Sequence, residues 1–403
     1  MIDIFKKLLR PVYHWFKLNL LADKVKYIPL EELNHRALIR QDSINEICYL
    51  PISENNKSYT KTYKPVDIKL YELSNIYANV NSSSFLAKSE KLAYIETFPY
   101  VGNQKLNYIS GYLLYHDSIF AYFKVDKINQ IRKFDKVLFL GGNGSFNFYH
   151  WMIEIAPKLL CLSNDLLNKY EIDTIVVNDK VRDIENFQWI FQKSIQHLED
   201  INVVYSNQSE TFYANKLYLI NTFNQTIFNF FKPKDLPFIS SIYNKAILIA
   251  FVERLSSSVD TGEDDSPSKI FILRNNNSIS SYNKRHYNED EVFHFFEKNG
   301  FVGVYPDKMT LLQQIKLFKN ADFIVGPSGS SWANLIFAKP YTKAISWLPE
   351  SAKFFDTYSS LAGMFNIDMR FLIYQTFESD NLHSSYSLSI DKLKATYESI
   401  LSI

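Results

Sequence analysis

The hydrophobic period of this chain changes near residue 136, and this change limits the folds that the chain can adopt. From there on, short apolar runs of strand length alternate with longer stretches of helical period. The apolar runs occupy residues 136–140, 172–178 and 201–205, and the stretches between them predict helices at 148–162 and 184–197. Strands separated by helices in this way predict a parallel β-sheet with helices on its faces.

The same alternation begins again after a polar, serine- and acid-rich run at 256–268, which predicts a loop near a domain junction. Two of the later helices have starts with the spacing of a capping box, namely Asn288 with Glu291 and Thr310 with Gln313. Two alternating α/β series in tandem predict an α/β fold with two facing Rossmann-like domains.

The expected organisation has four segments. These are a basic amphipathic segment at 1–30, a small β-rich lead-in at 31–130, a first Rossmann-like domain at 131–240 and a second at 241–403. The first segment carries six Lys or Arg against two Asp, interleaved with large apolar residues. Such a segment can contact an anionic membrane surface peripherally, and a helix packed on its own domain explains it equally well.

Composition narrows the class of protein. The chain has 403 residues, and its 44 basic against 43 acidic residues give a net charge of +1, which argues against a nucleic-acid partner. The longest apolar run, at 246–252, is far below the ~20 residues that a bilayer span requires, and no cleavable signal is evident. Cys48 and Cys161 have no metal-binding spacing and fit a reducing cytosol, so we expect a cytoplasmic protein without a disulfide framework.

Glycine is scarce in this chain, with 11 in 403 residues, so each one marks a position where the backbone needs it. Gly141, Gly142 and Gly144 form one turn after a predicted strand, and Gly326 and Gly329 bracket a second. Ligands of open parallel sheets bind beyond the carboxyl ends of the strands. The two glycine turns are therefore the predicted sites.

The helix predicted after the first turn carries His150, Glu154 and Lys158 at intervals of four, which places them on one face. A histidine and a carboxylate one turn apart can act as an acid/base pair and take a proton from a sugar hydroxyl. A solvated face with an ion pair is an alternative, and a zinc site would need the second histidine of HExxH, which is missing. Glu154 is the first choice as general base because a carboxylate is ionised at neutral pH without help. The residues expected to line the acceptor part of the cleft are Gly142, Asn143, Asn147, Trp151 and Lys158.

The second turn, at 326–331, is predicted to join a strand to a helix, and Arg274 directly follows another predicted strand. Backbone N–H groups and hydroxyls at such a turn favour phosphate, and an arginine fork can hold a diphosphate bidentately. An ordinary tight turn is the alternative, since the loop matches neither Walker A nor GxGxxG. The candidate donor-binding residues are Arg274, Gly326, Ser328, Gly329, Ser330, Ser331 and Asn334, with Trp332 as either a ligand contact or a packing residue.

The stretch NFYHWMIEIAPKL at 147–159 is similar to the N-Y/F-x-H-W-x-x-E-x-x-P-K/R signature of glycosyltransferase family 61, the DUF563 group. FILRNNN and ADFIVGPSGSSWANLIF follow in the order and spacing of that family, and the resemblance covers about residues 67–400. Ser328 stands where the family usually has His, and SSW at 330–332 replaces its usual A-G-L. A role that the family gives to that histidine does not carry over.

The resemblance implies a GT-B-like fold, with a nucleotide sugar held by the C-terminal domain and a glycan acceptor by the N-terminal one. It also implies inverting transfer without a metal ion or other cofactor and, for bacterial members, work on surface polysaccharide such as capsule, O-antigen or lipooligosaccharide. No DxD motif adjoins either turn, which agrees with metal-independent transfer. Two alternatives stay open: a non-catalytic sugar-binding or scaffold protein of a polysaccharide assembly complex, and a nucleotide-sugar epimerase of related fold.

Overall fold

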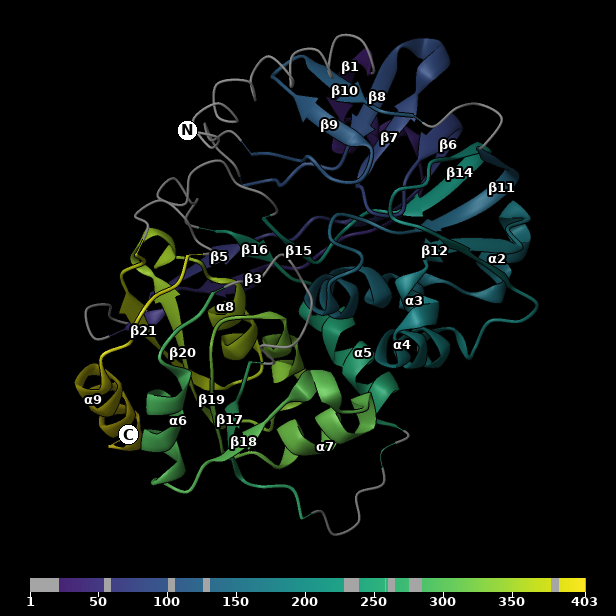
Figure 1. The fold of residues 1–403 in the computed structure, drawn as a ribbon. Coiled ribbons are helices and arrows are strands. Elements are labelled where there is room, and N and C mark those ends of the chain that lie inside the picture. The colour runs from purple at the N-terminus through teal and green to yellow at the C-terminus, as the bar shows by residue number, and fades with distance from the viewer. Residues whose placement is uncertain are drawn as a thin grey trace. The chain divides into compact units, whose positions relative to one another are not determined.

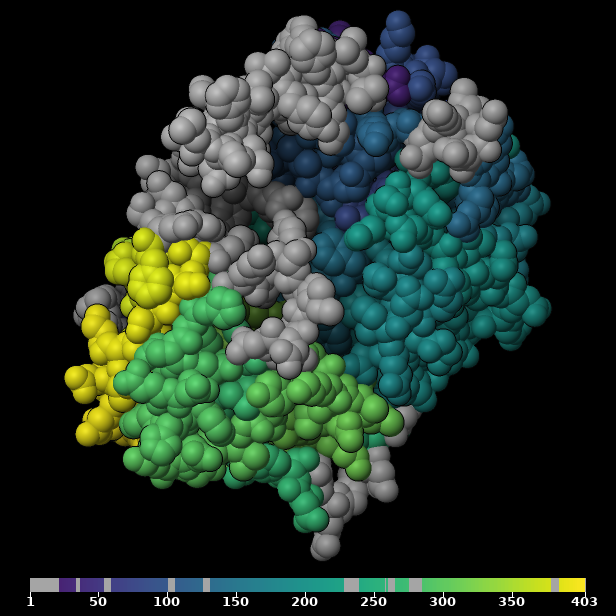
Figure 2. Space-filling model, viewed as in Figure 1, coloured from purple at the N-terminus to yellow at the C-terminus, as the bar shows by residue number. Residues whose placement is uncertain are grey.

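The computed structural model describes residues 22–53, 59–100, 106–125, 131–227, 239–257, 259, 265–274, 285–377 and 384–402. The remaining residues are drawn in grey in Figure 2, and the first part of the basic segment, 1–21, lies among them. The described residues form two compact units. Unit 1 runs to Asp42 and then takes in Val66–Pro99 and Leu106–Phe223, whereas unit 2 takes in Ser43–Pro65 and the chain from Asn224.

Unit 1 is built on one large mixed sheet (Figure 1), whose strand order is β13-β12-β11-β14-β6-β7-β8-β1-β10-β9, with β2 paired to β6. The strands β13, β12, β11 and β14 are parallel, and β14 pairs antiparallel with β6. The elements of unit 1 are β1 Asp23–Pro29, η1 Leu30–Arg36, β2 Ala37–Gln41, β6 Ile68–Ala78, β7 Ser84–Ala87, η2 Lys88–Glu90, β8 Leu92–Ile95, β9 Leu113–His116, β10 Phe120–Phe123, β11 Arg132–Leu140, η4 His150–Ile155, η5 Ala156–Cys161, α2 Asn164–Tyr170, β12 Thr174–Asn178, α3 Lys180–Asp183, α4 Glu185–Ile195, β13 Asn202–Ser206 and β14 Phe212–Ile220.

Unit 2 is built on a six-stranded sheet of order β18-β17-β19-β20-β21-β4, in which every neighbouring pair is parallel. Helix α9 packs on β20 and β21, and α5, α7 and α8 pack around η8. The elements of unit 2 are β3 Glu46–Tyr49, β4 Ile52–Ser53, β5 Thr60–Tyr63, β15 Gln225–Thr226, β16 Ser241–Ile242, α5 Lys245–Ser256, β17 Lys269–Ile272, α6 Glu289–Glu297, β18 Val302–Val304, η7 Pro306–Lys308, α7 Leu311–Asn320, β19 Phe323–Val325, η8 Ser330–Phe337, β20 Lys343–Pro349, η9 Glu350–Ala352, α8 Thr357–Met364, β21 Asp368–Tyr374 and α9 Ile390–Leu401.

The mixed α/β class expected from the sequence is confirmed, but the β-rich stretch expected at 31–130 is shared between the two units. Most of its strands extend the sheet of unit 1, because β6 pairs along its length with β14, a strand that the sequence analysis did not predict. Strands β3, β4 and β5 belong to unit 2 instead. Strand β1, at the end of the basic segment, pairs with β8 and β10.

The helix expected at 148–162 is irregular. It consists of the π-helix η4 followed by the 3-10 helix η5, and Pro157 stands in the first turn of η5. Proline lacks the N–H that an α-helix needs at that point, which accounts for the change. The capping box at Thr310 is present, whereas Asn288 makes no capping bond to its helix and is hydrogen-bonded to Leu388 and Glu291 instead.

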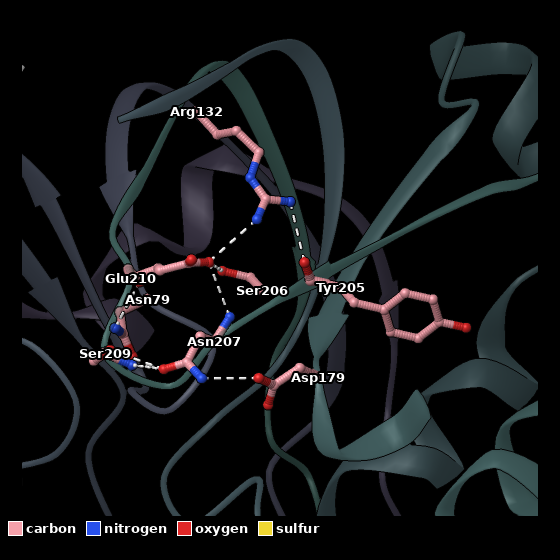
Figure 3. A network of polar contacts seen from close by, with 8 residues as sticks. All are labelled: Asn79, Arg132, Asp179, Tyr205, Ser206, Asn207, Ser209 and Glu210. Atoms are coloured by element: carbon pink, nitrogen blue, oxygen red, sulfur yellow. Dashed lines mark hydrogen bonds and ion pairs between the residues drawn. The ribbon is translucent and has the colours of Figure 1, made fainter. Parts of the chain in front are cut away.

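A polar network stabilises the short connection between β13 and β14 (Figure 3). The Glu210 carboxylate accepts hydrogen bonds from the Arg132 guanidinium at 3.2 Å and from the Asn207 backbone N–H at 3.0 Å. The Asn207 side chain donates to Asp179 at 2.8 Å and accepts from Ser209. These bonds fix the loop locally, since they satisfy its polar groups close to the surface.

Candidate functional site

The turn after β11 brings its glycines against neighbouring backbone and side chains. The Gly142 N–H donates to the Val80 carbonyl at 3.1 Å. Gly144 has a φ of 72°, a left-handed conformation that favours glycine. A Cβ at Gly144 would lie 2.6 Å from Cδ2 of His150, so the absence of a side chain lets the imidazole lie directly against the turn.

The first residue of η4, His150, is bonded to Glu154. The His150 Nδ1 lies 2.8 Å from Oε2 of Glu154, and the two side chains are 16% and 6% exposed. The expected pairing is therefore present, and burial argues against the alternative of a solvated helix face. Functional sites often adjoin short π-helical segments such as η4.

Lys158 extends this site into the interior rather than toward solvent. Its Nζ donates to Oγ1 of Thr222 at 2.9 Å, and the backbone N–H and Oγ1 of Thr222 donate to the Glu96 carboxylate at 2.7 and 2.8 Å. Burial lowers the pKa of the Lys158 ammonium, and the charges of Glu96 and Glu154 oppose that shift. All these side chains are less than a tenth exposed, so the network is a buried one.

Of the expected acceptor residues, Asn143 and Asn147 stabilise the glycine turn and its connection to η4, whereas Trp151 lies in the core. Asn143 bonds Ser83 twice, through its side-chain oxygen and its backbone N–H, each at 3.1 Å. The Asn147 side chain accepts from the Tyr149 N–H. Trp151 is fully buried and stacks on Phe187, with ring centroids 5.7 Å apart, so its expected contact with an acceptor is not supported.

The strand order of unit 2 places the second candidate site at a topological switch point. Strand β17 has β18 on one side and β19 on the other. After β17 the chain adds β18 at one side, and it then crosses over to add β19, β20 and β21 at the other side. Ligands of open α/β sheets bind in the crevice at such a point, beyond the carboxyl ends of the strands. Arg274 follows β17 and the turn at 326–331 follows β19, so both predicted donor-site elements lie beyond the carboxyl ends of these neighbouring strands.

Arg274 is held there by carbonyl groups. Its guanidinium donates to the Arg285 carbonyl at 2.7 Å and to the Ser328 carbonyl at 3.3 Å, and its Cζ lies 5.8 Å from the centroid of the Tyr287 ring. The described residues place no carboxylate within ion-pair distance of this guanidinium. The Glu289 carboxylate accepts from the Arg274 backbone N–H at 3.1 Å and interacts with its charge, whereas the guanidinium itself contacts two carbonyls and a ring. Such a guanidinium can bind an anion. Because Arg274 contacts the backbone of Ser328, the departure from the family histidine there leaves this contact in place.

Two further residues close to Arg274, namely Arg285 and Tyr358, were not identified from the sequence. Arg285 and Arg274 both act electrostatically on Tyr358, and burial raises the pKa of the Tyr358 phenol to about 12. Tyr358 also lies against Trp332, with ring centroids 6.5 Å apart. Arg285 lies in a short basic run after the predicted strand, which could have drawn attention to it. No spacing rule connects that run to the turn at 326–331.

Asn334 and Trp332 support the second turn from inside. Both are fully buried; the Trp332 indole donates to the Pro327 carbonyl at 2.8 Å, and the Asn334 amide donates to Gln314 at 2.8 Å. Gly326 approaches Ile272 so closely that a Cβ would lie 2.7 Å from it. Of the expected donor residues, Asn334 is thus placed in the core, whereas Arg274 and Ser328 are in contact beyond the ends of β17 and β19. Gly329 is the N-cap residue of η8, whose first residues are Ser330 and Ser331.

Among the described residues, no group of three or more His, Cys, Asp or Glu side chains could hold a metal ion. In the same part of the chain, no helix is both long and apolar enough to cross a bilayer.

The family model Glycosyltransferase 61 matches residues 148–345, just under half of the chain. The matched part begins two residues before His150 and includes Glu154, Arg274 and the turn at 326–331, so it contains the main elements of both candidate sites. This match supports glycosyltransferase family 61. A search of curated proteins found no match to this chain.

Proposed function

We propose that this protein is an inverting glycosyltransferase that moves a sugar from a nucleotide-sugar donor to a glycan acceptor in bacterial surface polysaccharide biosynthesis, at the inner face of the cytoplasmic membrane. The observation that carries the proposal is the hydrogen-bonded and partly buried His150–Glu154 pair, near the start of the region matched by the family model. Unit 1 would handle the acceptor, and unit 2 the donor.

In the proposed reaction, the acceptor hydroxyl oxygen attacks the anomeric carbon and the bond from that carbon to the diphosphate oxygen breaks. The hydroxyl proton moves to the base in unit 1, and the diphosphate leaves with the bonding electrons. Sequence alone favoured Glu154 as this base. Exposure favours His150, because its ring is the more exposed of the pair. The Glu154 carboxylate at Nδ1 favours the tautomer with a proton on that nitrogen, for which Nε2 is the basic atom.

The donor half of the proposal relies on the guanidinium of Arg274. Charge grows on the diphosphate as the glycosidic bond breaks, and a preorganised cation stabilises that charge. Arg274, with Arg285 nearby, would supply it together with the turn at 326–331. No metal ion has a role in this scheme, so turnover should be the same in the presence of EDTA.

The test is a panel of nucleotide sugars, screened first by thermal shift and then by release of nucleoside diphosphate with and without glycan acceptors. Transfer to an acceptor, with an inverted anomeric configuration in the product, would support the proposal. Donor binding without release or transfer would support the alternative of a sugar-binding scaffold. Isomerisation of the donor without an acceptor would indicate an epimerase.

A further inference from the structure

A pocket of 470 Å³ lies on unit 1, where β11, β14 and β6 run side by side (Figure 1). Neither candidate site contributes to it. Its lining residues come from these three strands, from η2 and from the residue that precedes β11: Asn75, Tyr77, Lys88, Ser89, Ile131, Lys133 and Tyr213.

Strand register aligns three of these residues in one row across the sheet. Lys133 is opposite Tyr213, and Tyr213 is opposite Tyr77. Residues directly opposite each other share a face of the sheet. The residues next to Tyr213 along β14, Phe212 and Ala214, are buried in the hydrophobic core, so the row lies on the face away from that core.

The two tyrosines form an aromatic surface with fixed polar groups. Their ring centroids are 5.1 Å apart with planes inclined by 60°. The Tyr213 hydroxyl donates to Oδ1 of Asn75 at 2.8 Å, which orients the Asn75 amide and leaves its NH₂ group as a donor. Aromatic rings beside amide and hydroxyl donors suit a sugar, whose C–H face is apolar and whose edge carries hydroxyls.

The pocket is also positively charged. Among the residues that the structure describes, Lys88 and Lys133 line it and no acidic side chain does. Lys88 pairs with Asp23 at 2.8 Å, whereas Lys133 has no ion-pair partner among the described residues. The charge of Lys133 is therefore available to an anionic group of a ligand.

We infer that this pocket binds an acidic oligosaccharide, with a sugar ring against Tyr77 and Tyr213 and a carboxylate at Lys133. It is distinct from the reacting site, because Lys133 is near the start of β11 whereas the glycine turn and His150 follow its end. The pocket would hold a part of the glycan remote from the acceptor hydroxyl. The inference deepens the proposed function, since it specifies an acidic glycan as the acceptor class.

Direct binding tests the inference without a donor or turnover. The probes are a tetramer of galacturonic acid and its fully methyl-esterified form, which has nearly the same shape and no charge. We expect the acid to bind by titration calorimetry and the ester to bind at least about fivefold more weakly. Lys133→Gln should lower affinity for the acid about fivefold and leave that for the ester unchanged, and Tyr213→Ala should lower both about tenfold.

The chain offers a matched control in Tyr122, which forms a second tyrosine pair with Tyr115 in the same sheet, with centroids 5.6 Å apart. Tyr122→Ala should leave affinity unchanged. If Tyr213→Ala does not fold, Lys133→Gln with the two probes still decides. Equal affinity of wild type and Lys133→Gln for the acid would overturn the inference, as would equal binding of acid and ester. If the inference fails but the protein still transfers sugar to a neutral acceptor, the proposed function stands. If the pocket binds the acid but no donor is turned over, the inference stands and the proposed function fails.

Discussion

His150 and Glu154 are one turn apart, and our proposal takes His150 as the base whereas the sequence favoured Glu154. If His150 is the general base, His150→Ala should lower turnover by about 10² to 10⁴-fold while donor affinity stays near the wild-type value. Added imidazole should restore part of the activity of His150→Ala, because a free base can occupy the space that the ring leaves. Steady-state kinetics with and without imidazole measures both effects.

Glu154→Gln supplies the comparison. In our scheme Glu154 orients His150 through the 2.8 Å hydrogen bond to Nδ1. Glu154→Gln should therefore lower turnover less than His150→Ala does. A larger loss for Glu154→Gln, with an imidazole-insensitive His150→Ala, would return the role of base to Glu154.

In the proposed function, donor binding relies on Arg274. Arg274→Lys should weaken nucleoside diphosphate binding although the charge is kept, because a lysine cannot supply the planar fork that contacts two carbonyls and leaves N–H groups for a phosphate. Calorimetry with the nucleoside diphosphate measures the change. Arg370→Lys is the matched control in the same unit, since Arg370 pairs with Asp368. Equal affinities for wild type and Arg274→Lys would exclude Arg274 from the site.

At the scale of the element, the turn after β11 is predicted to be required for the position of His150. Gly144→Ala introduces a side chain at a φ of 72° and places a Cβ 2.6 Å from the imidazole. We expect a loss of about 1 to 2 kcal/mol in stability from the backbone strain, and a loss of turnover beyond what that destabilisation explains. Urea unfolding and kinetics on the same samples separate the two.

Gly300 offers the control for this variant. Its φ of 85° is also left-handed, but a Cβ there would meet nothing within 4 Å. Gly300→Ala should therefore show similar destabilisation with unchanged turnover per folded molecule. The interpretation of Gly144 fails if both variants lose activity to the same degree.

The elements also show how far the sequence determines the site. The interval of four between His150 and Glu154 and the capping box at Thr310 are local patterns, and both were predictable. Glu96 was not, because it meets Thr222 through hydrogen bonds across 126 residues of sequence. The irregular helix at 150–161 was indicated only by Pro157. The pairing of β6 with β14 was not predictable, because the sequence of β14 has no clear alternation of apolar and polar residues.

At the scale of the whole molecule, a buried acid connects an early segment of the chain to the late part of unit 2. The Asp356 carboxylate accepts from Cys48 Sγ at 2.8 Å and from the Ser240 backbone N–H at 3.2 Å. Burial raises the pKa of Asp356 from 3.8 to about 6. Below pH ~4 the carboxyl is protonated in both states, so its contribution to stability is fully present there.

As the pH rises toward 6, only the unfolded chain releases this proton. The folded state should therefore lose up to about 3 kcal/mol of stability through this group between pH ~4 and ~6. Asp356→Asn keeps the shape and cannot ionise, so its stability should fall less over that interval. Urea unfolding of both proteins across the pH range gives the comparison, and parallel curves would contradict the shifted pKa.

We predict that the basic N-terminal segment binds the protein to anionic membranes. Residues 1–21 carry four Lys or Arg against one Asp, together with large apolar residues, and they precede β1. A deletion that extended into β1 would remove a strand paired on both sides, so the informative variant ends at residue 21. We expect the full chain to sediment with vesicles containing anionic lipid and to be released by salt, because screening weakens the attraction of lysine and arginine to lipid phosphates. The chain lacking 1–21 should stay in solution while it keeps its affinity for the donor, which shows that it is folded. Vesicle binding that survives this deletion would locate the membrane contact elsewhere in the molecule.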